Sequence, residues 1–409
     1  MYNIKKLSYN VFFKHFWLIF FVTISLQCRI VGKDSGKKFG QVREQEIVES
    51  IALSRIKGLG TKNLKRLIKE FGTIADIVNA SVKGLSSTPK IGEKLARSIK
   101  NELDINAAEV IYQQELKKGA RILPYTHPDY PARLRRMADG PLVLYYKGSQ
   151  DLNPRRTLGL VGTRNPSEEG PLIVEKILSE IKPYNVVTVS GLAYGVDACC
   201  HRFSLENGLP TIGVLAGGLS DIYPPSNRSL SQKMLENGGL LTEYHSGVEM
   251  IRENFPVRNR IIAGLSDALI VVESKEKGGS MITAQLAFDY NRFVFAIPGR
   301  VTDEKSRGCN KLIKTHVASL LESVEDITEM LNWDLGEDAN LARQGLLFDE
   351  LTESEKRIVD IMRENPRIHI DQLSMLSKFR PGLLANLLLE LELKGHIQSL
   401  PGQMYRLKP

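Results

Sequence analysis

The chain has 409 residues, a length typical of two or three domains, and its apolar content of 42% suits packed cores rather than a disordered polymer. Its four cysteines form no C-x-x-C pair, which excludes a disulfide framework and indicates a reducing compartment such as the cytoplasm. The net charge of +8 does not by itself indicate nucleic acid, because residues 1–38 carry seven Lys and Arg against one Asp.

Residues 1–40 begin like a signal peptide but lack its cleavage site. Lys5, Lys6 and Lys14 precede an apolar run at 16–26, which is too short to span a bilayer comfortably. No small-residue cleavage pattern follows the run. We interpret the segment as an extension, either disordered or created by a mis-assigned start, and expect no membrane association.

Residues 41–125 predict a helical domain with two similar hairpins. The strings RIKGLGTKNLKRLIKEFGT (55–73) and LSSTPKIGEKLARSIKN (85–101) each predict a helix, a tight glycine turn and a basic helix. This is the helix-hairpin-helix pattern, in which exposed backbone N–H groups can hold a phosphate without reading sequence. The alternative is a packing domain with a basic outer face.

Residues 126–330 predict an α/β domain built on a parallel sheet. Four apolar strands each lead to a small, polar, Gly-rich loop and then to a helix. Continuous apolar runs are typical of buried parallel strands, whose loops gather at one edge of the sheet. The four units are LGLVGTRNPSEEG (158–170), VVTVSGLAYGVDACCH (186–201), TIGVLAGGLSDIYPPSN (211–227), and the stretch from the RNR string (258–260) through the strand at 268–272 to GGSMITAQLAF (278–288).

These four loops predict an anion-binding site. Glycines let the backbone approach a ligand, and the following helices direct their N-terminal N–H groups at it. Arg164, Arg258 and Arg260 add guanidinium groups, which match phosphates well. Neither the G-x-G-x-x-G fingerprint nor a P-loop is present, which argues against the usual nucleotide cradles. One such loop is explained by turn glycines and solvated arginines, but four in series are not.

An aromatic residue and a rigid loop complete the predicted site. Phe255 precedes the arginines, and an exposed ring beside guanidinium groups suits single-strand binding because bases stack on it. The alternative for Phe255 is an ordinary core position. Asn227 follows Pro224 and Pro225 on a rigid loop at the sheet edge.

Three carboxylates and a Cys-Cys-His string are weaker candidates for chemistry. Asp197, Asp221 and Glu273 lie at strand or loop ends, where capping explains them better than acid–base work. The consecutive residues 199–201 point in different directions on a helix, so they cannot easily share a metal ion. We expect both cysteines to fill the core and His201 to serve packing or capping.

A nucleotide-hydrolase alternative rests on the loop at 278–283, which superficially resembles the Gly-rich loop of Rossmann-like hydrolases. Those enzymes need a glutamate on the following helix, where this chain has Ala284, Gln285 and Ala287. Without that carboxylate there is no obvious base for glycosidic cleavage. The sequence therefore favours binding over catalysis.

Residues 331–351 form an acidic linker, and 352–409 predict a winged helix. A capping box, Thr352 with Glu355, opens the first of three predicted helices, and SLPGQMYRL (399–407) predicts the wing. Duplex contact by the helix at 381–392 is one possibility. That helix is strongly apolar and ends acidic, which favours contact with protein.

Six strings resemble one known family, the DNA-processing protein A family (DprA/Smf), and the likeness runs from about Gln41 to the end. They are VGTR (161–164), SGLAYGVD (190–197), GLSDIYPPSN (218–227), FPVRNRIIAGLS (255–266), GGSMITAQ (278–285) and IPGR (297–300). The resemblance implies a Rossmann-like core between the helical and winged-helix domains. It implies a cytoplasmic, non-enzymatic homodimer that binds single-stranded DNA and loads RecA recombinase in natural transformation or recombination, without cofactor or metal.

One departure from the family pattern is Tyr194, which stands where many relatives carry a basic residue. This argues against a phosphate contact at that position and leaves stacking on a base. The DNA-binding residues that we predict are Gly162, Thr163, Arg164, Ser167, Ser190, Gly191, Tyr194, Asn227, Phe255, Arg258, Asn259, Arg260, Gly279 and Ser280.

Overall fold

The structure is a computed structural model that describes residues 43–334 and 352–407, apart from 366, 394–395 and 401. The extension at 1–40 and nearly all of the acidic linker lie outside the described residues. Within the described ranges, no helix combines the length and the apolar character needed to cross a membrane.

The N-terminal part is helical, as predicted, and we call α2–α7 the helical module. Its first hairpin differs from the prediction, because residues 55–60 form the turn between α2 and α3 rather than the start of a helix. Gly58 at φ +87° allows this turn, and Gly60 caps α3. The bounds are α2 (Glu44–Ser54), α3 (Thr61–Phe71), α4 (Ile74–Asn79), α5 (Val82–Ser87), α6 (Glu93–Asn101) and α7 (Ile105–Lys117).

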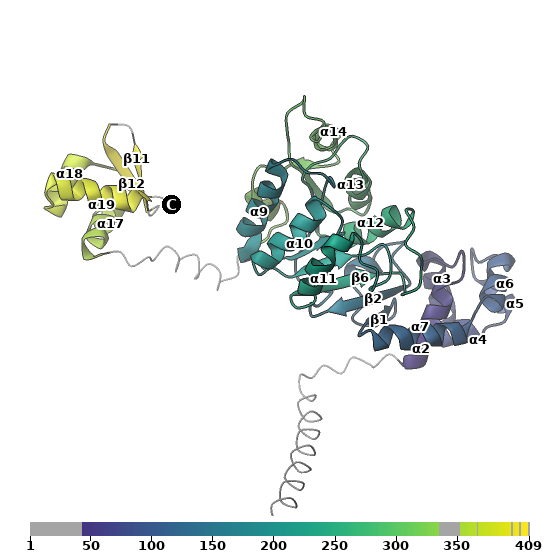
Figure 1. The fold of residues 1–409 in the computed structure, drawn as a ribbon. Helices are drawn as coiled ribbons and strands as arrows, with labels where there is room; N and C mark the ends of the chain where they lie inside the picture. Colours follow the sequence, from purple (N-terminus) through teal and green to yellow (C-terminus); the bar gives the residue numbers. More distant parts are fainter. Residues whose placement is uncertain (1–42, 335–351, 366, 394–395, 401, 408–409) are drawn as a thin grey trace, which may run out of the picture.

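The helical module packs against the β1 and β2 edge of the sheet (Figure 1). Ile51 and Leu67 of the module share one hydrophobic core with Val143 and Tyr145 of β2. Near the first hairpin, the Lys65 ammonium donates to the carbonyls of Arg135 at 2.8 Å and Met137 at 3.0 Å. Part of the basic helix that we predicted to bind phosphate therefore contacts the sheet domain instead.

The sheet has the order β1-β2-β6-β5-β4-β3-β7-β8-β9, with every pair from β6 to β9 parallel. β1 and β2 add an antiparallel edge. The strands are β1 (Arg121–Pro124), β2 (Val143–Gly148), β3 (Thr157–Val161), β4 (Val187–Ser190), β5 (Thr211–Val214), β6 (Gly238–Thr242), β7 (Ala268–Val271), β8 (Phe293–Ala296) and β9 (Ser319–Leu320).

Helices cover both faces of the parallel sheet, which makes this the predicted Rossmann-like domain. β7 shows why: Ala268 and Ile270 enter one core with α9 and α10, whereas Leu269 and Val271 enter another with α12 and α13. All four are buried, as expected of a strand with no solvent face. The helices are α8 (Ala132–Arg135), α9 (Glu169–Ile181), α10 (Val196–Glu206), α11 (Arg228–Met234), α12 (Asn254–Leu265), α13 (Gly279–Asp289), α14 (Arg307–Lys314) and α15 (Val324–Met330).

Two features of this domain differ from the prediction. The strand β6 was not anticipated, because its GGLLT sequence carries little strand signal. The RNR string does not lie on a loop: residues 258–260 are in the middle of α12, which begins at Asn254. Their arginines therefore point where the helix directs them, in different directions.

The C-terminal part is a winged helix, as predicted. The capping box of Thr352 and Glu355 opens α17, and the Thr352 backbone N–H donates to the Glu355 carboxylate at 2.8 Å. Its strands form a sheet in the order β10-β12-β11. The elements are α17 (Glu353–Glu364), β10 (Ile368–His369), α18 (Ile370–Ser377), α19 (Pro381–Leu393), β11 (Ile397–Leu400) and β12 (Met404–Leu407).

Candidate nucleic-acid interface

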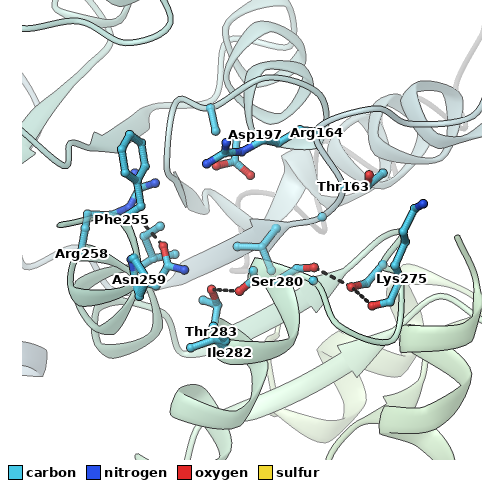
Figure 2. Close-up of a pocket in the computed structure, with 18 of the residues that line it drawn as sticks. Thr163, Arg164, Asp197, Phe255, Arg258, Asn259, Lys275, Ser280, Ile282 and Thr283 are labelled. Carbon is cyan, nitrogen blue, oxygen red and sulfur yellow. Dashed lines mark hydrogen bonds between the residues drawn. The ribbon is translucent and has the colours of Figure 1, made fainter. Parts of the chain in front are cut away.

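A cleft opens at the carboxyl ends of β3 and β7, where the strand order reverses. The chain runs outward from β3 through β4, β5 and β6, then returns to the other side of β3 with β7. Such switch points are where open α/β sheets bind ligands. The cleft has a volume of about 760 Å³, and its walls come from the loops after β3 and β7, from α12 and from the start of α13 (Figure 2).

The loop after β3 is held so that it presents Arg164 at the cleft. The Thr163 N–H donates to the Glu273 carbonyl at 2.8 Å, and the Ser167 N–H donates to the Glu273 carboxylate at 2.9 Å. Gly195, at φ +76°, lies so close to Thr163 that a Cβ there would collide with its carbonyl. Both ends of the Arg164 loop are therefore fixed.

Arg164 itself is exposed and available to a ligand. Its guanidinium lies 5.5 Å from the centre of the Phe255 ring, a cation–π arrangement. In the part of the chain that the structure describes, Arg164 forms no ion pair. A phosphate can therefore be bound without first displacing a carboxylate.

Three aromatic rings form a row along the mouth of the cleft. Tyr194 and Tyr223 meet edge to face with ring centres 6.4 Å apart, and Tyr223 meets Phe255 in the same way at 5.8 Å. Tyr194 and Tyr223 are 46% and 45% exposed, so much of each ring faces solvent. Phe255 is partly buried rather than exposed. Rings in series next to a guanidinium offer stacking surfaces for successive bases where they reach solvent.

The start of α13 forms the opposite wall. Gly279 has open space where a side chain would stand, so a ligand can approach its backbone, and the Ser280 hydroxyl donates to Ser274 at 2.8 Å. Lys275 and Lys277 precede this helix and also line the cleft. Positive side chains and a helix N-terminus together favour an anion.

Arg258 lines the floor of the cleft but is buried, with only 3% of its surface exposed. Its guanidinium donates to the carbonyls of Gly191 and Val214. Burial lowers the pKa of Arg258 to about 10, and the nearby Asp197 carboxylate opposes that shift. Arg258 therefore lies on a helix and not on a loop as predicted, and its guanidinium joins the loop after β4 to the end of β5 from beneath the cleft.

Arg260 is also placed differently from the prediction. It lies on another side of α12 and does not line the cleft. Its guanidinium pairs with the Glu243 carboxylate and donates to the Asp139 carbonyl at 2.7 Å. Burial raises the pKa of Glu243, and the Arg260 charge counteracts this. Arg260 is thus already engaged by the protein.

The structure brings eight of the fourteen predicted residues together as cleft lining. They are Gly162, Thr163, Arg164, Phe255, Arg258, Asn259, Gly279 and Ser280. Tyr194 stands outside the lining but continues the aromatic row.

Four further predicted residues support the loops instead of lining the cleft. Ser190 is buried and donates to the Leu160 carbonyl at 2.6 Å. The Asn227 amide donates to the Leu192 carbonyl at 2.9 Å, which steadies the loop that carries Tyr194. Ser167 bonds Glu273, and Gly191 leaves room for the Arg258 guanidinium.

Sequence reasoning missed several lining residues. Tyr223 lies in the GLSDIYPPSN string, where its position next to two prolines was the available signal. Arg252 and Met250 come from the loop before α12, and Lys275, Lys277, Ile282 and Thr283 surround the predicted Gly-Gly-Ser. Only the sheet order brings these segments together.

Two of the three candidate acid–base groups accept hydrogen bonds from nearby loop backbone. The Glu273 carboxylate accepts from Ser167 at the start of α9, and Asp197 accepts from the Gly191 N–H at 3.2 Å. His201 is fully buried beside Thr211, and burial lowers its pKa to about 3, which keeps the ring neutral. Cys200 and Cys309 are buried, Cys199 is partly so, and all three are unpaired.

Family profiles match three successive parts of the chain. Residues 121–332 match the profile of DNA recombination-mediator protein A. Residues 50–104 match that of a SAM-like helix-hairpin-helix tandem, and residues 348–403 match that of the DprA winged helix domain.

Comparisons with individual proteins point to the same family as the profiles. Protein Smf of Synechocystis is 31% identical over 388 residues, covering 87% of this chain and 97% of the relative. The DNA processing protein DprA of Bacillus subtilis is 39% identical over 239 residues, covering 58% of this chain and 80% of the relative. The X-ray structure of DNA processing protein A from Streptococcus pneumoniae superposes with a TM-score of 0.60 at 29% identity, over 71% of this chain and 99% of that one.

Proposed function

Because the chain belongs to the DNA recombination-mediator protein A family (DprA/Smf), we propose that the cleft of its Rossmann-like domain binds single-stranded DNA. The observation that supports this most is the aromatic row of Tyr194, Tyr223 and Phe255 beside the exposed guanidinium of Arg164. Paired bases in a duplex hide their faces, so only a single strand can use such a row.

Different groups of the cleft would contact the phosphates and the bases. Arg164 and the N–H groups at the start of α13 would hold phosphates, and Arg252 and Lys277 add charge at the rim. The rings would stack on bases of any sequence, because every base has an aromatic face.

For the cellular role, our proposal is supported by membership of the family and by no feature of the cleft. A recombination mediator that holds single-stranded DNA is placed to pass that strand to RecA recombinase, as a homodimer, during natural transformation or recombination. The unpaired cysteines suit the reducing cytoplasm, where this activity would act. These steps extend the proposal beyond the cleft itself.

We expect the chain to bind a single-stranded oligonucleotide more tightly than the duplex of the same sequence. Fluorescence polarisation with labelled oligonucleotides over a series of salt concentrations measures both affinities. Binding should weaken steeply with salt, because phosphate contacts release counterions. Equal affinity for both forms at every salt concentration would contradict the proposal.

Phe255→Ala should lower the affinity for single-stranded DNA by about tenfold, the loss of one stacked base. The salt dependence of DNA binding by this variant should equal that of the unsubstituted chain, because the substitution removes no charge. Phe288→Ala is the matched control, since Phe288 is 46% exposed on α13 and lies outside the cleft lining. If both substitutions weaken binding equally, the ring of Phe255 is not a stacking surface.

The proposal also holds that the cleft performs no nucleotide hydrolysis. The first seven residues of α13, Gly-Ser-Met-Ile-Thr-Ala-Gln, include no carboxylate that could activate water, and Glu273 is bonded to Ser167. Incubation with nucleoside monophosphates should release no free base by chromatography. Repeated turnover that Glu273→Gln abolishes would show that the cleft is an active site.

A further inference from the structure

Glu115 is a buried carboxylate that none of the proposed DNA contacts uses. It lies near the end of α7, with only 1% of its surface exposed. Its Oε1 accepts a hydrogen bond from the Ser246 backbone N–H at 2.7 Å. Since Glu115 belongs to the helical module and Ser246 to the Rossmann-like domain, this bond joins the two.

Ser246 stands in the loop at 243–253, which connects β6 to α12 and forms one rim of the cleft. The loop turns at Gly247, at φ +97°, where the Val248 N–H donates to the His245 carbonyl at 3.2 Å. A few residues later it places Met250 and Arg252 in the cleft lining. The turn that Glu115 holds and the side chains that meet the ligand are therefore parts of one short segment.

The far end of the loop is held separately. The Asn254 amide donates to the Ala216 carbonyl at 3.1 Å and to the Glu249 carbonyl at 3.3 Å. The Ser246 turn, in contrast, is bonded to the helical module.

The Ser246 turn packs closely against the Rossmann-like domain. The loop lies directly on Gly217 and Gly218, where added Cβ atoms would meet Met250 and the Ser246 backbone. The Tyr145 ring stands 6.5 Å from the His245 ring. A displacement of the turn would therefore be passed on to Met250 and its neighbours.

Among the described protein atoms, Glu115 Oε2 and Ser246 Oγ are buried and find no hydrogen-bond partner. Removing the Glu115 carboxylate would leave the partly buried Ser246 N–H without its acceptor, which favours opening of the turn to water.

We propose that Glu115 is a positioning residue for the cleft: its carboxylate fixes the Ser246 turn and thereby the places of Met250 and Arg252. Through this bond the helical module would shape the cleft from outside it. The effect on affinity rests on the proposed single-strand function, whereas the effect on the loop does not.

Hydrogen exchange of the DNA-free chain tests the contact itself. Glu115→Ala should speed amide exchange at 244–250 by about tenfold while α2 and α3 keep their protection. Glu115→Gln keeps an acceptor oxygen and should restore slow exchange. Glu109→Ala is the matched control, because this α7 carboxylate bonds Gln113 of its own helix. Unchanged exchange at 244–250 in Glu115→Ala would overturn the proposal.

Polarisation with single-stranded DNA tests the consequence. Glu115→Ala should weaken binding about fivefold, yet less than twofold in an Arg252→Ala background, because coupled residues are not additive. An equal loss in both backgrounds would overturn the proposal, since the effect would not pass through the loop. If the unchanged chain bound no single-stranded DNA, the proposed function would fail, and hydrogen exchange alone would still decide whether Glu115 holds the turn.

Discussion

Arg164→Ala is expected to lower the affinity for single-stranded DNA by about tenfold or more at low salt, because it removes a charge-assisted contact to phosphate. The loss should also reduce the dependence of binding on salt, since one fewer counterion is released. Polarisation titrations at several salt concentrations measure both quantities. Arg164 is exposed at the cleft, so the fold should tolerate its removal.

Arg202→Ala is the matched control for Arg164→Ala. Arg202 is an exposed arginine on α10 whose guanidinium lies over the ring of its neighbour Phe203. Its removal takes away the same charge at a place away from the cleft. A comparable loss of affinity in both variants, with unchanged circular dichroism, would argue against a binding site at the sheet edge.

Arg258→Ala should lower the free energy of unfolding by about 3 kcal/mol, because it leaves buried polar groups without hydrogen-bond partners. The carbonyls of Gly191 and Val214 would lose their donor, and buried Asp197 would lose a neighbouring positive charge. Burial raises the pKa of Asp197, and the Arg258 charge opposes this rise, so the loss favours protonation of that carboxyl. Urea denaturation followed by circular dichroism measures the change.

Arg258→Lys separates charge from shape in the same experiment. A lysine supplies the positive charge but not the fork that reaches two carbonyls, so most of the stability should still be lost. Arg202→Ala should cost under about 0.5 kcal/mol, as is usual at the surface. A stable Arg258→Ala protein that had lost only DNA affinity would instead make Arg258 a ligand contact.

The sequence predicted the sheet well because its strands carry an unambiguous pattern. The apolar runs at 158–161 and 268–271 are buried on both faces, and each leads to a polar loop at the same sheet edge. Arg164 and Gly279 could be placed from these runs alone, since each stands just past the end of a strand or at the start of a helix. The strand β6 was not predicted from the sequence because two of its five residues are glycines.

The arginines of α12 show what local reasoning cannot supply. Arg258 and Arg260 are two residues apart, which on a helix turns them about 200° from each other, so both cannot face one cleft. A string of three polar residues does not reveal whether it lies on a loop or on a helix. Sequence likewise gave no reason to join Tyr223 with Phe255, which meet only because the sheet order brings their segments together.

Polar residues near the cleft mislead for a different reason. Ser190 and Asn227 are predicted DNA contacts, yet Ser190 donates to a carbonyl of strand β3 and Asn227 to a carbonyl of the loop after β4. Loops that must hold a charged ligand need their own backbone groups satisfied first. Such supporting residues are as necessary to the cleft as those that line it.

Photo-crosslinking tests the central claim most directly. The full chain would be irradiated with a single-stranded oligonucleotide that carries 5-iododeoxyuridine, and the attached peptides identified by mass spectrometry. Stacking in the cleft predicts cross-links at Tyr194, Tyr223 and Phe255 that unlabelled single strand removes by competition and duplex does not. Cross-links confined to the hairpins of the helical module or to the winged helix, with the peptides of the cleft unmodified, would contradict the account.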